Sequence, residues 1–440
     1  MMNEIQRNAK PKRKEPSAWT QTILAAMTNY IDAGSIVAGG AGLTLWEKEF
    51  GMTATQLGLL GAFSSNAISA AVGALIGGRI CDKFGRKFVY TYDLLFYMLG
   101  MLLIIFAQNF AMLFIGYCVV GLAVGAGITA SWTLIAEQAP SEKRARHCGA
   151  AQVAWALGPT IVLLLSVPLG KYGLLGNRIV FGHLFIVALI TWLLRFGMPE
   201  SENWKANKEK EKALIASGQL KRVTWHDFFG KMINIRTLLF LTGVYAIWNL
   251  AAGTVGFYMQ HVCENVFGQT NQTANMLLAL YFGITVLATF FIFMGLGDRV
   301  NRRLLYFVLA LCGVAAWSLL TYAGYYNISS VAILIGFVIL FGINNGSCQQ
   351  PFYQLWNSEL YPTRYRAFAQ GITFFTARLI LGIWNIIFTR INGEGDFPRA
   401  AAMMVGFMVF SLLVGTLFAP NTAGKTLEEI EKERYGDHLS

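Results

Sequence analysis

Two residues of opposite charge stand inside long apolar runs of the sequence, and both could do chemistry there. Asp32 closes the segment NYID, and Arg378 lies within the segment TARL. A charge in apolar surroundings is costly, so a charge found there is a functional candidate. A carboxyl group in such a place can take up a proton and release it when water reaches it. A guanidinium stays charged and offers a planar fork for carboxylate, phosphate or sulfonate.

Each of these charges also has a structural interpretation. Asp32 could be bonded to a neighbouring helix, and Arg378 could form an ion pair, with Asp32 as one candidate partner. The functional interpretation assigns proton transfer to Asp32 and binding of an anionic group to Arg378. A pair between the two residues could serve both roles, and the sequence leaves these alternatives open.

A cluster of amide side chains near residues 344–357 is the second candidate for binding. Gln350 and Gln354 are four residues apart, and so are Asn345 and Gln349, so each pair shares one face of a helix. Amides both donate and accept hydrogen bonds, which suits a hydroxyl-rich ligand. Trp248 is expected to meet ligand hydroxyls together with Gln350, Gln354 and Asn345. Further candidates in the apolar runs are Asn249, Tyr258 and Tyr30, and weaker ones are Gln152 and Trp155.

The composition indicates which elements must position these residues. Of the 440 residues, 55% are hydrophobic and only 13% are charged, and the mean hydropathy is +0.49. A soluble domain has roughly 25% charged residues, so a water-soluble globule is excluded. Crossing a bilayer takes about 20 apolar residues in a helix. Twelve runs qualify, near 19–46, 54–80, 88–108, 110–136, 148–170, 179–198, 235–262, 272–294, 303–325, 328–357, 367–391 and 399–419.

The net charge of +11 is explained by topology rather than by binding of nucleic acid. Lys and Arg gather in the N-terminal tail and in alternate loops, after the second, fourth, eighth and tenth runs. The positive-inside rule then places both termini in the cytoplasm. The six cysteines show no metal or disulfide spacing, and no nucleotide-binding or nucleophile-elbow motif is present, so we expect no enzyme activity and no cofactor.

The chain repeats itself in two halves. The pattern E-x-x-P-x-x-x-R occurs at 137–144 and again at 359–366, and the segment GRICDKFGRK at 78–87 has a degraded copy, DRVNRR, at 298–303. The longest charged loop separates the halves. The expected segments are a cytoplasmic tail at 1–18, a six-helix bundle at 19–198, a cytoplasmic linker at 199–234, a second six-helix bundle at 235–419 and a cytoplasmic tail at 420–440.

These motifs resemble those of a known family. The segment 78–87 is similar to the G-x-x-x-D-[RK]-x-G-R-[RK] signature of the major facilitator superfamily, and the E-x-x-P-x-x-x-R patterns resemble those of its sugar porters. PESENW at 199–204 and PNTAGKTLEEI at 420–430 also resemble sugar porter motifs. The resemblance implies a charge network that governs gating, and its candidates are Asp82, Arg86, Glu137, Arg144, Glu359 and Arg366. Plain topological positive charge is the alternative for the arginines.

The same resemblance bears on the interior residues. Proton-coupled sugar porters carry an Asp in the first helix, which makes Asp32 the implied proton carrier, but the Arg that usually pairs with it is replaced by Tyr117. Gln354 stands where sugar porters keep Trp, and the expected Q-Q-x-x-G-x-N motif of the seventh helix is absent. Arg378 is similar in position to an Arg of organic-anion transporters. The resemblance therefore argues against a plain hexose.

We expect an all-α, polytopic membrane protein of 12 transmembrane helices in two pseudo-symmetric six-helix bundles. The expected function is proton-coupled symport of a small hydroxylated organic anion, such as a sugar acid, by alternating access. The alternatives are a symporter of a neutral sugar or polyol and, from another class, a transporter-like receptor or drug exporter. The expected partners are a small-molecule substrate and membrane lipid, with no nucleic acid, for a monomer in a bacterial inner membrane.

Overall fold

The computed structural model describes residues 17–53, 56, 59–60, 63, 67–196, 200–217, 228–393, 396–420 and 422–436. Helices make up nearly all of this part of the chain, which contains no strand. The first half comprises α2 (Ala18–Phe50), α4 (Ile68–Phe84), α5 (Arg86–Ile105), α6 (Phe110–Gln138), α7 (Arg144–Leu169) and α8 (Leu174–Arg195). The second half comprises α11 (Met232–Leu241), α12 (Ile247–Asn265), α13 (Asn271–Ala288), α14 (Met294–Leu296), α15 (Arg302–Tyr325), α16 (Val331–Ser347), α17 (Gln349–Glu359), α18 (Arg366–Gly393) and α19 (Phe397–Phe418).

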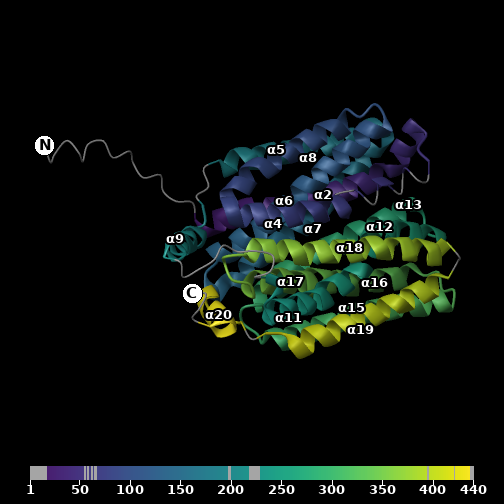
Figure 1. Ribbon diagram of the computed structural model, residues 1–440. Coiled ribbons are helices and arrows are strands. Elements are labelled where there is room, and N and C mark those ends of the chain that lie inside the picture. The colour runs from purple at the N-terminus through teal and green to yellow at the C-terminus, as the bar shows by residue number, and fades with distance from the viewer. Residues whose placement is uncertain are drawn as a thin grey trace.

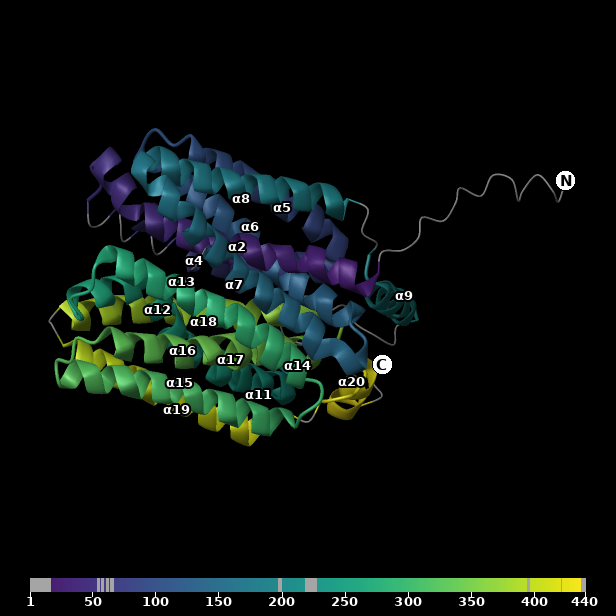
Figure 2. The ribbon, with the colours of Figure 1, turned by 180° about the vertical axis from the view of Figure 1, so that it is seen from behind.

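The two halves form two bundles that lie against each other (Figures 1 and 2). Ten described helical runs are long and apolar enough to cross a membrane. α2, with 33 residues, and α4, with 17, complete the predicted set of twelve. Large apolar side chains such as Phe96 and Ile186 are more than half exposed on the outside of the bundles, as contact with lipid requires. The predicted fold class is confirmed.

Within the described residues, three of the predicted helices are interrupted. A π-helical turn, η3 (Thr242–Ala246), joins α11 to α12, and a second, η4 (Thr289–Phe293), joins α13 to α14. The run predicted at 328–357 breaks at Cys348, whose φ of −114° and ψ of −108° are not helical, so α16 and α17 are separate helices. Such breaks leave backbone N–H and C=O groups in the middle of a bundle without their hydrogen bonds within the helix. These interruptions often occur at binding sites.

Close approach of helices holds the halves together. α4 packs against α18, and α7 packs against α13, η4 and α14. A Cβ atom at Gly78 would collide with the backbone of Ala367, and one at Gly371 would collide with the backbone of Ala74. Glycine at these two positions therefore lets α4 and α18 touch backbone to backbone.

Two short helices outside the bundles, α9 (Glu202–Ala216) and α20 (Leu427–Tyr435), lie at one end of the molecule (Figure 1). The Arg364 side chain pairs with Glu211 of α9 at 3.0 Å. The Tyr435 hydroxyl of α20 donates to Asn234 at 2.7 Å. We call this end, where the two repeated motifs lie, the motif end.

Candidate functional site

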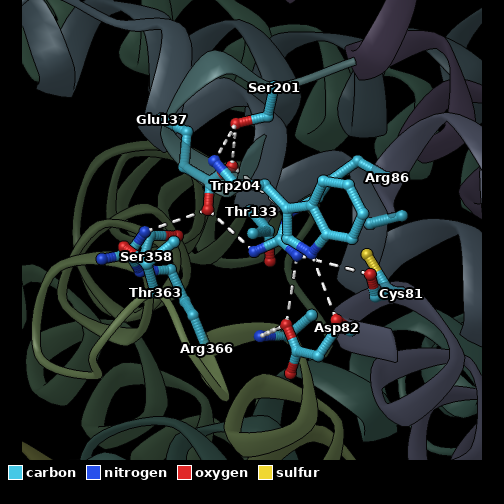
Figure 3. A network of polar contacts seen from close by, with 12 residues as sticks. Cys81, Asp82, Arg86, Thr133, Glu137, Ser201, Trp204, Ser358, Thr363 and Arg366 are labelled. Atoms are coloured by element: carbon cyan, nitrogen blue, oxygen red, sulfur yellow. Dashed lines mark hydrogen bonds and ion pairs between the residues drawn. The ribbon is translucent and has the colours of Figure 1, made fainter. Parts of the chain in front are cut away.

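Four of the six predicted gating residues, Asp82, Arg86, Glu137 and Arg366, meet in one network at the motif end (Figure 3). The Glu137 carboxylate accepts from Arg86 Nη2 at 2.8 Å and from Arg366 Nη1 at 3.1 Å. The Ser201 hydroxyl also donates to Glu137. Arg86 and Glu137 belong to the first half and Arg366 to the second, so this cluster crosses the contact between the halves.

A second cluster mirrors the first. The Glu359 carboxylate, in the second half, accepts from Arg144 Nη1 of the first half at 3.0 Å. Arg302 Nη1 donates to the same carboxylate at 3.1 Å. The Glu of each repeated motif thus pairs with the Arg of the other copy. All four side chains of the two motifs are buried, so their ion pairs depend on the halves staying together.

Two aspartates place their charges at the N-termini of helices in the opposite half. Asp82 accepts from the backbone N–H groups of Phe368 at 2.7 Å and Ala367 at 3.3 Å, at the start of α18. Asp298 accepts from Ala145 N at 3.0 Å and Arg146 N at 3.1 Å, at the start of α7. A carboxylate at a helix N-terminus accepts hydrogen bonds from the free N–H groups and is stabilised by the positive end of the helix dipole.

Sequence reasoning did not list Asp298 as a site residue, although a signal was present. Asp298 opens the degraded copy of the 78–87 segment and occupies the position that corresponds to Asp82. Burial raises the pKa of the Asp298 carboxyl, while the two backbone N–H groups and Arg302 act in the opposite direction. The degraded copy therefore keeps the residue that bridges the halves.

The segment after α8 braces the same network. Glu200 accepts from Arg86 N at 2.9 Å and from Lys87 N at 3.0 Å, and Trp204 Nε1 donates to Asp82 O at 3.1 Å. Pro199, the first residue of the PESENW motif, lies outside the described residues. The resemblance to sugar porter motifs thus corresponds to contacts between the linker and the start of α5.

An uncharged layer lies one helical turn further into the bundle. The Thr133 hydroxyl of α6 donates to Gln370 Oε1 of α18 at 2.9 Å, and Gln370 Nε2 donates to Ser358 Oγ at 3.1 Å. All three side chains are fully buried. The sequence analysis missed this layer. Its only signal is spacing, because Thr133 precedes Glu137 by four residues and Gln370 follows Arg366 by four.

Asp32 and Arg378 lie in the interior, between the two halves. The exposed fraction is 1% for Asp32 in α2 and 4% for Arg378 in α18. No hydrogen bond of normal geometry reaches either oxygen of the Asp32 carboxylate from the described residues. The Trp155 side chain is nevertheless near enough to act on the carboxylate as a hydrogen-bond donor, and the charge of Arg378 acts on it as well. The structure therefore brings the two interior charges into one neighbourhood.

A chain of amides crosses between the halves. Gln152 Nε2 of α7 donates to Asn345 O of α16 at 3.2 Å, and Gln354 Nε2 of α17 donates to Gln152 Oε1 at 3.5 Å. Gln354 Oε1 and Asn345 Oδ1 are buried and have no hydrogen-bond partner in the described part of the chain. Two spare acceptors beside a cross-half bridge can receive hydroxyl donors of a ligand.

The other predicted binding residues have different surroundings. Trp248 Nε1 donates to Asn344 Oδ1 at 3.0 Å, a contact inside the second half. The Tyr30 hydroxyl lies 3.1 Å from His183 Nε2, inside the first half. The Trp155 ring meets Phe282 across the halves, with 6.2 Å between the ring centroids.

Three predicted residues show few interactions that bear on a ligand. Gln350 is buried in α17, and Asn249 is buried with its Nδ2 atom lacking a hydrogen-bond partner among the described residues. Tyr258 is partly buried and packs against Phe388, with 5.1 Å between the ring centroids. The amide chain and the Asp32–Arg378 neighbourhood therefore define the candidate site.

Comparison with known proteins agrees with this geometry. Residues 22–385 match the family model of the Major Facilitator Superfamily. The minor myo-inositol transporter IolF of Bacillus subtilis is 49% identical over 421 residues, covering 96% of this chain and 95% of that protein. The galactose-proton symporter of Escherichia coli strain K12 is 26% identical over 446 residues, covering 93% of this chain and 92% of that protein.

A solved structure has the same fold. The proton:xylose symporter XylE bound to 6-bromo-6-deoxy-D-glucose superimposes with a TM-score of 0.81 at 18% sequence identity, covering 94% of this chain and 98% of that one. The relatives named here are transporters and not enzymes. The chain belongs to the Major Facilitator Superfamily, as a multi-pass membrane transporter similar to the sugar porters.

Proposed function

We propose that this protein carries a neutral cyclic polyol, of the myo-inositol class, across the membrane by alternating access. The observation that carries the proposal is the amide chain of Gln152, Gln354 and Asn345 between the halves, with its two spare acceptor oxygens. Polyol hydroxyls both donate and accept, so they can replace the amide–amide contacts without leaving a buried group unpaired. The 49% identity to a minor myo-inositol transporter supports the same substrate class.

A neutral substrate fits the interior better than the hydroxylated anion that the sequence analysis put first. That prediction assigned Arg378 to the acid group of the substrate and left a pair between Arg378 and Asp32 as an alternative. Asp32 supplies a negative charge in the same neighbourhood, so the two charges balance. The relatives named as inositol or galactose transporters favour the sugar or polyol alternative.

Asp32 is the proposed proton carrier. The residue is only 1% exposed, and a charge buried at membrane depth is costly. Protonation would remove that cost, and water reaching the site would restore the charge. Proton symport is the coupling expected for uptake against a gradient.

The motif end is the proposed cytoplasmic end, by the distribution of Lys and Arg in the loops. It is closed in this structure by the Glu137–Arg366 and Glu359–Arg144 pairs. Release of substrate on that side requires both pairs to separate as the halves rock. We propose a monomer in a bacterial inner membrane, with both termini in the cytoplasm.

Uptake into proteoliposomes tests the proposal. We expect saturable accumulation of labelled myo-inositol that a protonophore abolishes and that excess unlabelled myo-inositol prevents. Gln152→Ala should lower uptake at least tenfold, because it removes the cross-half amide. Gln269→Ala, in the loop between α12 and α13, is the matched control and should keep wild-type uptake. Accumulation of a hydroxylated carboxylate such as quinate, without accumulation of any neutral polyol, would refute the proposed function.

A further inference from the structure

The interior holds two opposite charges that come from the two halves of the molecule. Asp32 belongs to α2 and Arg378 to α18, and both are at least 96% buried. The position at which the family resemblance leads one to expect an Arg partner for Asp32 is Tyr117, whose ring packs against Phe181, 6.3 Å between centroids, inside the first half. The positive charge near Asp32 is therefore supplied from the opposite half.

A path of side-chain contacts leads from Arg378 to α2, the helix that carries Asp32. The Arg378 guanidinium lies over the Phe374 ring, 4.7 Å from its centroid. The Phe374 ring meets the Trp132 ring edge to face at 5.8 Å. Trp132 Nε1 donates to Asn29 Oδ1 at 3.0 Å, and Asn29 is one turn before Asp32 on α2. Packing thus connects Arg378 to α2 at a point one helical turn from the carboxylate.

The amides of the proposed site belong to the same interior. Trp132 also meets Tyr353 of α17, with 5.7 Å between ring centroids, and Gln354 is the next residue along that helix. Tyr353 in turn stacks on Tyr245, with 4.0 Å between the ring centroids. A polyol held by the amide chain would therefore lie in the field of two opposite charges.

We propose that Asp32, while it is ionised and before it takes up the transported proton, determines the charge selectivity of the site: by balancing Arg378 it makes the interior accept neutral polyols and reject hydroxylated carboxylates. This inference rests on the proposed function. Removing one of two balanced charges leaves a unit charge in a medium of effective dielectric about 20. Acting over roughly 8 Å, such a charge changes the affinity for a charged ligand by about 30-fold.

Binding to the purified full chain in detergent tests the inference, with myo-inositol and quinate as the two probes. Both are hydroxylated cyclohexanes, and quinate adds a carboxylate. The readout is the ratio of their dissociation constants by calorimetry, because a ratio is insensitive to a general loss of affinity. In the wild type, myo-inositol binds and quinate binds at least tenfold more weakly. In Asp32→Asn, the dissociation constant of quinate should fall by about 30-fold relative to that of myo-inositol.

Asp93→Asn is the matched control, because Asp93 pairs with Arg195 at 3.7 Å in another buried Asp–Arg pair, inside the first half. It should leave the ratio within twofold of the wild type. The double variant Asp32→Asn/Arg378→Gln carries neither charge. Like the wild type, it should bind myo-inositol more tightly than quinate. A cooperative thermal transition confirms that each variant is folded.

The reciprocal variant provides a second, independent test. Arg378→Gln leaves the Asp32 carboxylate without its balancing charge. The affinity for an aminocyclitol, which carries an ammonium group, should therefore rise by about 30-fold relative to the affinity for myo-inositol. The inference is overturned if folded Asp32→Asn gains no quinate affinity, or if wild-type protein binds quinate as tightly as myo-inositol. If Asp32→Asn does not fold, the Arg378→Gln result decides. If wild-type protein binds quinate but no neutral polyol, the proposed function itself is wrong, which separates the two failures.

Discussion

Replacing Asp298 with Asn should loosen the closed motif end. In the structure the carboxylate bridges the halves by accepting from two backbone N–H groups of α7, at 3.0 and 3.1 Å. An Asn side chain offers one carbonyl oxygen, so one hydrogen bond and the negative charge are lost. The ion pair of Asp298 with Arg302, 3.5 Å, lies inside the second half and does not separate when the halves part.

The size of the effect follows from these two contacts. A hydrogen bond to a charged group contributes about 1.5–3 kcal/mol, and a charge at a helix N-terminus adds about 0.3–1 kcal/mol. The amide is less costly to bury than the carboxylate, which offsets part of this loss. A net change of about 2 kcal/mol remains, equivalent to a shift of about 30-fold toward the open form.

Cys148 is a native reporter for this opening. It is buried in the first turns of α7, two residues after Arg146, whose backbone N–H donates to Asp298 of the opposite half. The other five cysteines would be replaced by Ala or Ser. A water-soluble maleimide would then be added to vesicles that expose the motif end. When opening and closing are fast relative to alkylation, the alkylation rate is proportional to the open fraction.

Asp298→Asn should therefore raise the alkylation rate of Cys148 by about 30-fold. Glu433→Gln serves as the control, because Glu433 forms an exposed ion pair with Lys425, and exposed pairs contribute little. It should change the rate less than twofold. An alkylation rate for Asp298→Asn within twofold of the wild type would refute the assigned bridging role.

Three further predictions use the same protein. Gly371→Val should raise Cys148 reactivity and lower transport at least tenfold, since any Cβ there meets the backbone of α4; wild-type transport would contradict the close packing. In a double-mutant cycle, Thr133→Val and Gln370→Leu should couple by about 1 kcal/mol in the opening equilibrium, and additive effects would exclude the 2.9 Å bond as a cross-half contact. Trp248→Phe should lower the stability by about 1–3 kcal/mol, because it leaves Asn344 Oδ1 unpaired. The KM for myo-inositol should stay within twofold of the wild type, and a large rise in KM would show that Trp248 touches the ligand.

The architecture could be predicted from the sequence because length and composition decide which segments can cross a membrane. Repeated spacing likewise identified the charged residues of both motifs. It did not show that Glu137 meets Arg366 and that Glu359 meets Arg144, because these partners are 229 and 215 residues apart. Spacing within a helix defines a face but not the helix that this face meets.

The interior was harder to predict for the same reason. Arg378 taken alone indicates an anion site, and the sequence offered Asp32 only as one candidate partner among open alternatives. Trp248 was grouped with the ligand residues by its place in the seventh run, yet its N–H is committed to Asn344. The break at Cys348 leaves no clear trace in the apolar pattern, although it separates the helices that carry Asn345 and Gln354.

The most direct test of the central claim is an experimental structure of the protein with bound myo-inositol. The ring should lie between the halves, with its hydroxyls on Gln152 and on the spare oxygens of Gln354 and Asn345, and the direct Gln354–Gln152 contact at 3.5 Å should be replaced by contacts to the ligand. A ligand bound elsewhere, with the amide chain unchanged, would contradict the proposed site.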